Sequence, residues 1–196
     1  ENYDVHDLVR EFLTRSMDDS LSQSLHANAA EWYRVRKGNP SESIEYIHHL
    51  HMSGDTEGLA EALSEEGHSL VKAGHIELLG ILRVLEASLF GPRTRFVIHE
   101  LTGDILSIQG RWDEAEEQYD LALPIAVKHK LTTPLARIYS SRADLAVKKG
   151  EMDKALSLHK KALEMQIKLR DAQGAARSYN NMGYIFRRQR DNKRAI

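Results

Sequence analysis

Three histidines within four residues, His48, His49 and His51 in "EYIHHLHMSGD", are the residues of this sequence best suited to metal chemistry. Imidazole nitrogens bind zinc and related metals, usually three or four ligands to an ion. On a helix, His48 and His51 would share a face and His49 would point elsewhere, so a metal site would need a ligand from another element. The simpler interpretation is ordinary interhelical or surface histidines. We therefore expect no bound metal and no other cofactor.

Motifs for catalysis are incomplete elsewhere in the chain. "GHSLV" at 67–71 lacks the second glycine of a nucleophile elbow, and "HELTG" at 99–103 lacks the second histidine of a metalloprotease helix. Neither a G-x-x-x-x-G-K-[ST] loop nor a G-x-G-x-x-G fingerprint occurs, so nucleotide binding is not expected in these residues. We expect no catalytic residues. A histidine-based metal hydrolase stays open as a third alternative.

Composition narrows the class of protein further. The 196 residues are 41% hydrophobic and 29% charged, which is ordinary for a globular chain. A net charge of -2 lacks the basic excess of a bulk nucleic-acid binder. No apolar run approaches the roughly 20 residues that span a bilayer, so no membrane segment is expected. Cysteine is absent, which excludes disulfides and thiolate nucleophiles and fits the expected cytoplasmic location.

The elements that would hold any site are predicted by an internal repeat. Shifting the sequence by 40 residues aligns small residues, and the pairs are Gly110 with Gly150, Ala115 with Ala155, and Ala122 with Ala162. One more small-residue place holds Gly103, Ala143 and Gly183, and an aromatic place four residues earlier holds His99, Tyr139 and Tyr179. A weaker copy upstream contains Gly67 and Gly74. Each copy predicts two antiparallel helices joined near the glycine, and such pairs stack because one pair cannot bury its own faces.

This pattern resembles the tetratricopeptide repeat, which has a small residue in its first helix, a glycine at the turn and two alanines in its second helix. The resemblance implies an all-α, right-handed α-α superhelix with a degenerate repeat at 55–91, repeats at 92–131 and 132–171, and a truncated repeat at 172–196. Two departures stand out. The period of 40 exceeds the usual 34 and implies longer helices, and Arg190 replaces the turn glycine in the last copy.

Residues upstream of the repeats have a different sequence pattern. Residues 1–17 look like the end of a winged-helix-like domain, and 18–54 predict a linking helical hairpin broken at Gly38-Asn39-Pro40, with Ser41 as N-cap. The series "HDLVREFL", "LHANAAEWY" and "EYIHHLHMSGD" followed by repeats resembles prokaryotic signal-transduction ATPases with numerous domains (STAND ATPases). In that family the repeats form a sensor that restrains or releases a nucleotide-driven switch.

In tetratricopeptide folds the first helices line a concave groove, and the resemblance implies which residues do so here. They are Val97, Glu100, Asp104 and Ser107, then Arg137, Ser140, Asp144 and Lys148, then Arg177, Asn180, Tyr184, Arg187 and Arg188. This groove becomes basic toward the C-terminus. Its expected partner is an acidic peptide or a phosphate group held by arginine, with Asn180 on the peptide backbone. The alternative is a solvated helix face.

The basic run Arg187-Arg188-Gln189-Arg190, with Lys193 and Arg194, also raises nucleic acid as a ligand. Single-strand recognition needs aromatic side chains among the charges, and only Tyr184 and Phe186 are near, Phe186 being expected in the core. Nucleic-acid binding is therefore not expected. The favoured function is a non-catalytic protein-binding or sensor segment, and the alternative is a free-standing adaptor without an ATPase.

Two further expectations concern the repeats themselves. Pro124 predicts a kink or restart of the second helix near residues 122–125, because proline removes a backbone hydrogen bond. The last copy has one helix, so Met182, Ile185 and Phe186 are expected to lack cover, with self-association through that surface as a consequence.

Overall fold

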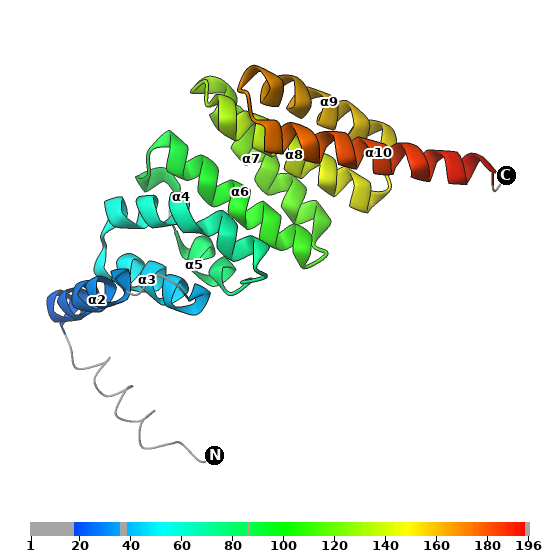
Figure 1. Ribbon diagram of the computed structural model, residues 1–196. Coiled ribbons are helices and arrows are strands. Elements are labelled where there is room, and N and C mark those ends of the chain that lie inside the picture. The colour runs from blue at the N-terminus through cyan, green and yellow to red at the C-terminus, as the bar shows by residue number, and fades with distance from the viewer. Residues whose placement is uncertain (1–17, 36–38, 86, 195–196) are drawn as a thin grey trace, which may run out of the picture. The chain divides into compact units, whose positions relative to one another are not determined.

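The computed structural model describes residues 18–35, 39–85 and 87–194, which fall into two compact units, Glu1–Ile81 and Leu82–Ile196 (Figure 1). Every regular element in the described residues is helical, which confirms the all-α class. The expected winged-helix-like remnant at 1–17 lies outside the described residues. The boundary between the units falls inside the predicted repeat 55–91, so the limits of the repeats stay predictions. No helix in the described part of the chain is long and apolar enough to cross a membrane.

Three helices of the first unit begin at residues whose side chains cap them. The described elements of this unit are α2 (Asp19–Arg34), α3 (Pro40–Ser53), α4 (Thr56–Lys72) and the start of α5 (Leu78–Val84). Asp18 accepts a hydrogen bond from the Leu21 amide at the start of α2. Asn39, and not Ser41, caps α3 by accepting from the Ser41 amide, because Pro40 already occupies the first helical position. α2 packs against α3, and α3 packs against α4.

The second unit contains the repeating hairpins. After η1 (Ala87–Leu89) come α6 (Pro92–Ile108), α7 (Trp112–Lys128), α8 (Thr132–Lys149), α9 (Met152–Lys168) and α10 (Ala172–Arg194). α6 pairs with α7 and α8 with α9, while α7 contacts α8 and α9 contacts α10 between successive hairpins (Figure 1). The helices of 17 and 18 residues confirm that the 40-residue period lengthens each helix.

The turns of this unit also repeat every 40 residues. Gly110 and Gly150 end the first helices with φ of 77° and 82°, and Lys130 and Arg170 end the second helices with φ of 54° and 57°. At each turn two amides satisfy carbonyls of the last helical turn, as when the Glu151 amide donates to the Ala146 carbonyl at 2.8 Å. The glycines were predicted, whereas Lys130 and Arg170 adopt a backbone conformation that costs a residue with a Cβ about 1 kcal/mol.

These left-handed turns lead to a prediction on stability. Arg170→Gly should raise the free energy of unfolding by about 0.5 to 1 kcal/mol, because glycine removes the strain of a left-handed residue. Gly150→Ala should lower it by about the same amount at the matching kind of turn. Urea denaturation of both variants beside the unaltered chain measures the effect. Equal changes in the same direction would contradict it.

Two helices depart from the expected breaks. α7 runs unbroken through Pro124, so the predicted restart is wrong. Pro124 has no amide hydrogen to donate to the Asp120 carbonyl, but its side chain is exposed and the helix continues on both sides of it. α10 continues past position 190 to Arg194, because the arginine there replaces the glycine that turns the chain in earlier copies.

The small residues of the repeat are buried as predicted, although one of them acts differently. Ala115, Ala122, Ala155 and Ala162 are each fully buried. Gly103 makes room for a side chain and not for a neighbouring backbone: a Cβ there would lie 2.5 Å from the Tyr119 ring. Buried alanines therefore recur in the α6–α7 and α8–α9 hairpins, and the first of these hairpins also packs a tyrosine ring against a glycine.

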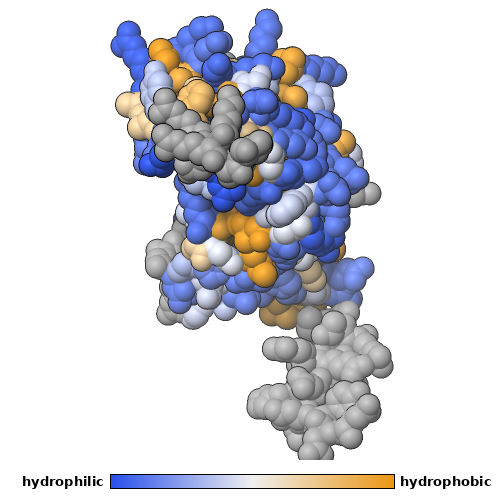
Figure 2. Space-filling model, turned by 90° about the vertical axis from the view of Figure 1, so that its right-hand side faces the viewer, coloured by the Kyte–Doolittle hydropathy of each residue, from blue (hydrophilic) through white to orange (hydrophobic). Residues whose placement is uncertain are grey.

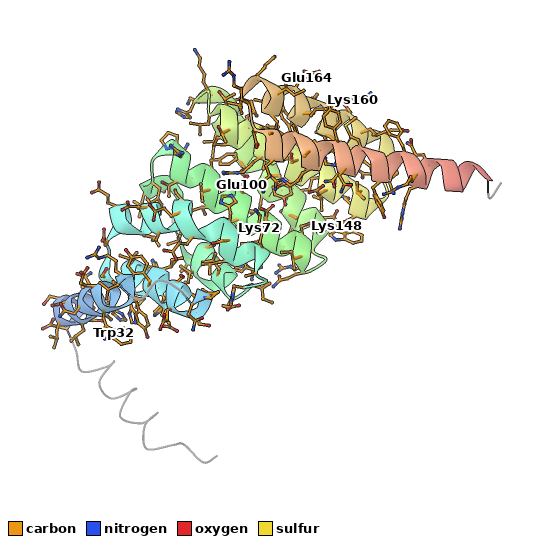
Figure 3. All side chains as sticks on the ribbon, viewed as in Figure 1. Trp32, Lys72, Glu100, Lys148, Lys160 and Glu164 are labelled. Atoms are coloured by element: carbon orange, nitrogen blue, oxygen red, sulfur yellow. The ribbon has the colours of Figure 1, made fainter. Side chains whose placement is uncertain are left out.

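Overpacking should distinguish these alanines from surface positions. Ala115→Leu and Ala155→Leu should each lower stability by about 1 to 3 kcal/mol, because neither fully buried site has room for three more carbons. Lys160→Leu, on the exposed side of α9, should leave stability nearly unchanged (Figure 3). Thermal melting of the three variants provides the comparison, and equal melting temperatures would remove the small-residue argument.

The apolar residues of the last helix are only partly uncovered. Ile185 is fully buried and packs with Ala146 and Ala155, so its expected exposure is wrong. Phe186 is 49% exposed, which agrees with its expected lack of cover and shows that its expected place in the core is wrong. Tyr179, at the aromatic place of the repeat, is 59% exposed. Figure 2 shows hydrophobic groups scattered among hydrophilic ones on the face turned to the viewer.

Candidate protein-binding face

All the predicted groove residues lie on the first helices α6, α8 and α10 of the second unit. We call their polar members the first-helix face. They are Glu100, Asp104 and Ser107 on α6, Arg137, Ser140, Asp144 and Lys148 on α8, and Arg177, Asn180, Tyr184, Arg187 and Arg188 on α10. Val97, the apolar member of the predicted set, is buried.

Arg137 is held by Glu100 across the α6 and α8 helices. Its Nε donates to Glu100 Oε1 at 3.0 Å and its Nη2 donates to Oε2 at 2.6 Å, a bidentate pair. The guanidinium also lies 5.9 Å from the centre of the Phe96 ring. The Glu100 side chain is only 1% exposed, so the pair is inside the helix packing on one side. Arg137 therefore joins two repeats and does not present an uncompensated charge to a partner.

Lys148 makes a second link between the same helices, closer to their C-terminal ends (Figure 3). Its Nζ donates to the Ser107 carbonyl at 3.1 Å and to Ser107 Oγ at 2.8 Å. The positive charge thus lies beside the last turn of α6, where the helix dipole favours a cation. An ammonium group has three protons to donate, and the side chain is exposed, so one donor remains for a ligand.

Two acidic residues of the face are matched by buried partners that sequence reasoning missed. The Tyr119 hydroxyl donates to Asp104 Oδ1 at 2.7 Å, and the fully buried His159 places Nε2 3.5 Å from Asp144 Oδ1. The 40-residue shift relates both members, Asp104 to Asp144 and Tyr119 to His159. Applying the 40-residue shift to polar residues as well as to small ones could have identified these two interactions as equivalent.

The described part of α10 is the most exposed part of the face. Arg177, Asn180, Tyr184, Arg187 and Arg188 all have exposed side chains. The Arg188 guanidinium lies 5.5 Å from the centre of the Tyr184 ring, within the range of a cation–π interaction. It is Asn181, and not Asn180, that donates to Asp144 at 2.9 Å. Cations and an aromatic ring are therefore presented together on this helix.

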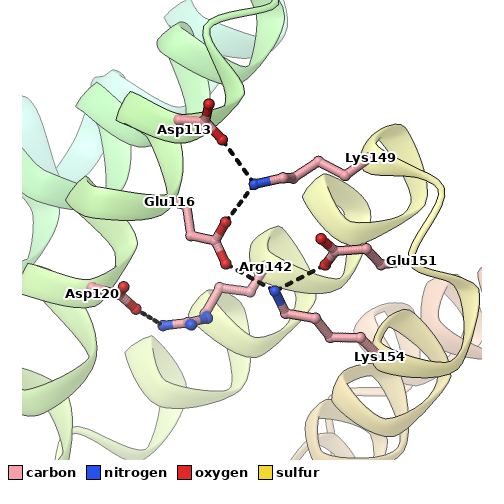
Figure 4. A network of polar contacts seen from close by, with 7 residues as sticks. All are labelled: Asp113, Glu116, Asp120, Arg142, Lys149, Glu151 and Lys154. Atoms are coloured by element: carbon pink, nitrogen blue, oxygen red, sulfur yellow. Dashed lines mark hydrogen bonds and ion pairs between the residues drawn. The ribbon is translucent and has the colours of Figure 1, made fainter.

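A different network of charges ties α7 to α8 and α9 (Figure 4). Lys149 Nζ lies 2.9 Å from Asp113 Oδ1 and 2.6 Å from Glu116 Oε2, while Lys154 Nζ lies 2.8 Å from Glu116 Oε1. Arg142 pairs with Asp120 at 2.5 Å nearby. Hydrogen bonds from Lys149 and Lys154 lower the pKa of Glu116 from 4.5 to about 2. The network joins successive hairpins and includes none of the predicted groove residues.

The lowered pKa predicts how acid affects this joint. A carboxyl group with a depressed folded-state pKa adds stability above its unfolded pKa of 4.5 and loses it as the pH falls toward 2. Glu116→Gln should therefore cost about 1 kcal/mol at pH 7 and nothing near pH 2. Glu117→Gln, an exposed change on the same helix, is the control. Urea denaturation at both pH values tests this, and a cost independent of pH would contradict it.

Two cavities in the described residues are small. One of about 10 Å³ lies within the charge network, and one of about 130 Å³ in the first unit is lined by residues that include Ala27, Ala30, Tyr46 and Leu50. Pockets for small organic ligands typically enclose about 300 to 1,000 Å³. These two cavities therefore favour recognition at a surface over enclosure of a ligand.

Comparison with known proteins agrees with the helical-hairpin architecture. Residues 134–196 match the profile of a family described as tetratricopeptide repeat. The crystal structure of BtubC (BKLC) from P. vanneervenii is similar over 92% of this chain and 70% of that one, at 23% identity and a TM-score of 0.51. A search of the curated proteins found no match. The matched residues are α8, α9 and α10, and the stacked-hairpin fold predicted from the sequence is confirmed. Tetratricopeptide repeats are typical of protein-protein interaction.

Proposed function

We propose that this chain is a non-catalytic segment that binds an acidic peptide of a partner or inducer protein on its first-helix face. The observation that supports this most is the group of exposed cations on α10 beside Tyr184. A carboxylate can accept two parallel hydrogen bonds from one guanidinium, which gives arginine both energy and geometric selectivity. An aromatic ring next to the charges supplies contact area at small entropic cost.

The structure changes which residues are assigned to binding. We leave Arg137 out of the proposed contacts, because its Nε and Nη2 groups already donate to Glu100, whose charge offsets that of the guanidinium. Asp144 stays on the face, where it accepts a hydrogen bond from the Asn181 side-chain amide. The proposed contacts to the partner are made by Lys148, Arg177, Tyr184, Arg187 and Arg188, with Asn180 toward the peptide backbone.

We further propose that the segment acts as the sensor of a cytoplasmic regulatory ATPase of the STAND type. The sequence series before the repeats supports this assignment, and a free-standing adaptor with the same binding face is the alternative. A P-loop and winged-helix domain encoded upstream in the same reading frame would favour the sensor. Their absence would favour the adaptor and leave the binding face unaffected.

Peptide binding is tested by fluorescence anisotropy with the full chain and a labelled peptide rich in glutamate. The matched control peptide carries lysine at each glutamate position. Arg187→Glu and Arg188→Glu should each weaken binding of the acidic peptide by about tenfold, because they replace attraction by repulsion. Lys160→Glu, which makes the same charge change on the exposed side of α9, should have little effect. If all three variants bind alike, the face is not the binding surface.

A further inference from the structure

Three histidines of the first unit converge from two helices. His26 on α2 and His48 and His49 on α3 each offer a ring nitrogen, and these three nitrogens all lie within 4.8 Å of one another. His26 Nδ1 and His49 Nδ1 are 2.7 Å apart. The ring of His48 lies 6.0 Å from that of His26 and 5.3 Å from that of His49, measured between centroids. Each residue is half-buried.

This arrangement corrects the expectation from sequence. His48 and His51 share a helical face, but His49 is the neighbour whose nitrogen meets that of His26. The ligand from another element that a metal site requires is therefore present, on α2. Adjacent residues on one helix point about 100° apart. The rings of His48 and His49 nevertheless both lie near the His26 ring, with 6.0 Å and 5.0 Å between ring centres.

We propose that His26, His48 and His49 form a site for a divalent transition-metal ion of the zinc type, with a fourth position open to water or another ligand. Zinc binds imidazole nitrogens at about 2.0 to 2.1 Å, and two ligands of one tetrahedral ion lie roughly 3.3 Å apart. The 2.7 Å pair of His26 and His49 would open by about 0.6 Å on that basis, and His48 would move inward. Rotation of the rings about their side-chain bonds supplies such shifts without moving the helices.

The surroundings of the three rings fit this use. Tyr33 stacks on His49, with 5.5 Å between ring centres and 19° between planes, which fixes the orientation of that imidazole. Glu45, four residues before His49 on α3, interacts electrostatically with it and adds negative charge beside a cation. Imidazole is mostly neutral above pH 7, the form that binds metals. A bound ion would tie α2 to α3, the two helices that already pack together.

Metal binding at this site can be measured directly on the full chain at pH 7.5, after any histidine tag has been removed. Isothermal titration with zinc chloride should give one ion bound per chain. His26→Ala should weaken the affinity at least about tenfold, as expected for loss of one of three ligands. His129→Ala, an exposed histidine at the end of α7, is the control and should bind as the unaltered chain does. Absence of binding, or equal affinity in both variants, would overturn the proposal.

A second readout does not depend on how the His26 variant folds. Trp32 lies 4.7 Å from Tyr33, which stacks on His49, and the only other tryptophan is Trp112 (Figure 3). Copper(II), which histidine sites bind more tightly than zinc, quenches nearby indole fluorescence. Stoichiometric copper should quench Trp112→Phe, in which Trp32 remains, and leave Trp32→Phe largely unquenched. Equal quenching of both variants would place the metal elsewhere and overturn the assignment.

Discussion

Gly103→Ala should lower the free energy of unfolding by about 1 to 3 kcal/mol, although alanine is the better helix residue by about 1 kcal/mol and so offsets part of the cost. The added Cβ would lie 2.5 Å from Tyr119 Cε1 and 2.7 Å from Cδ1, and Tyr119 is only 1% exposed. Overpacking of a core typically costs about 1 to 3 kcal/mol. Displacing the ring also breaks the hydrogen bond to Asp104, at about 1 kcal/mol more.

The same substitution at the equivalent place of the last copy should have the opposite sign. A Cβ at Gly183 meets nothing within 4 Å, so Gly183→Ala should raise stability by about 0.5 to 1 kcal/mol through helix propensity alone. Urea denaturation of the two variants measures both changes. Destabilisation of similar size at both sites would show that the contact with Tyr119 is not the cause of the stability loss in Gly103→Ala.

Arg137→Ala should lower stability by about 3 kcal/mol, because it removes the bidentate partner of a carboxylate that is 1% exposed. Arg177→Ala, at the equivalent place one repeat later, should change stability by no more than about 0.5 kcal/mol, since that side chain is exposed. Chemical denaturation at neutral pH gives both values.

The double variant Glu100→Leu/Arg137→Leu separates charge from packing. When both charges are removed, the buried carboxylate that Arg137 compensates is gone as well, so this variant should be more stable than Arg137→Leu alone. A double variant that is less stable than the single one would mean that Arg137 acts through its contact with Phe96 and not through its charge.

The 40-residue shift predicted most of the second unit because turns and small residues are set by local geometry. Gly110 and Gly150 are the turn residues, and the buried alanines fall where the shift places them. The shift identifies equivalent positions but not the atoms they meet. It aligned Gly103 with Ala143 without showing that a tyrosine ring fills the first place, and it assigned Arg137 to a groove without showing that Glu100 holds it.

The histidine cluster shows the same limit between two helices. Helical periodicity relates His48 to His51, because it describes a single element. The approach of His26 depends on how α2 packs against α3, which no spacing in the sequence expresses. Left-handed turns at Lys130 and Arg170 were missed for a related reason, since neither residue type is typical of that conformation.

The helix contacts within hairpins and those between hairpins of the second unit differ in extent. Within a hairpin, α6 on α7 and α8 on α9 pack most extensively, whereas α7 on α8 and α9 on α10 pack less. Part of the α7 to α8 joint consists of partly exposed ion pairs such as Lys149 with Asp113, whose strength falls as salt screens them. Added salt should therefore weaken the contact between α7 and α8 before it weakens the packing inside either hairpin.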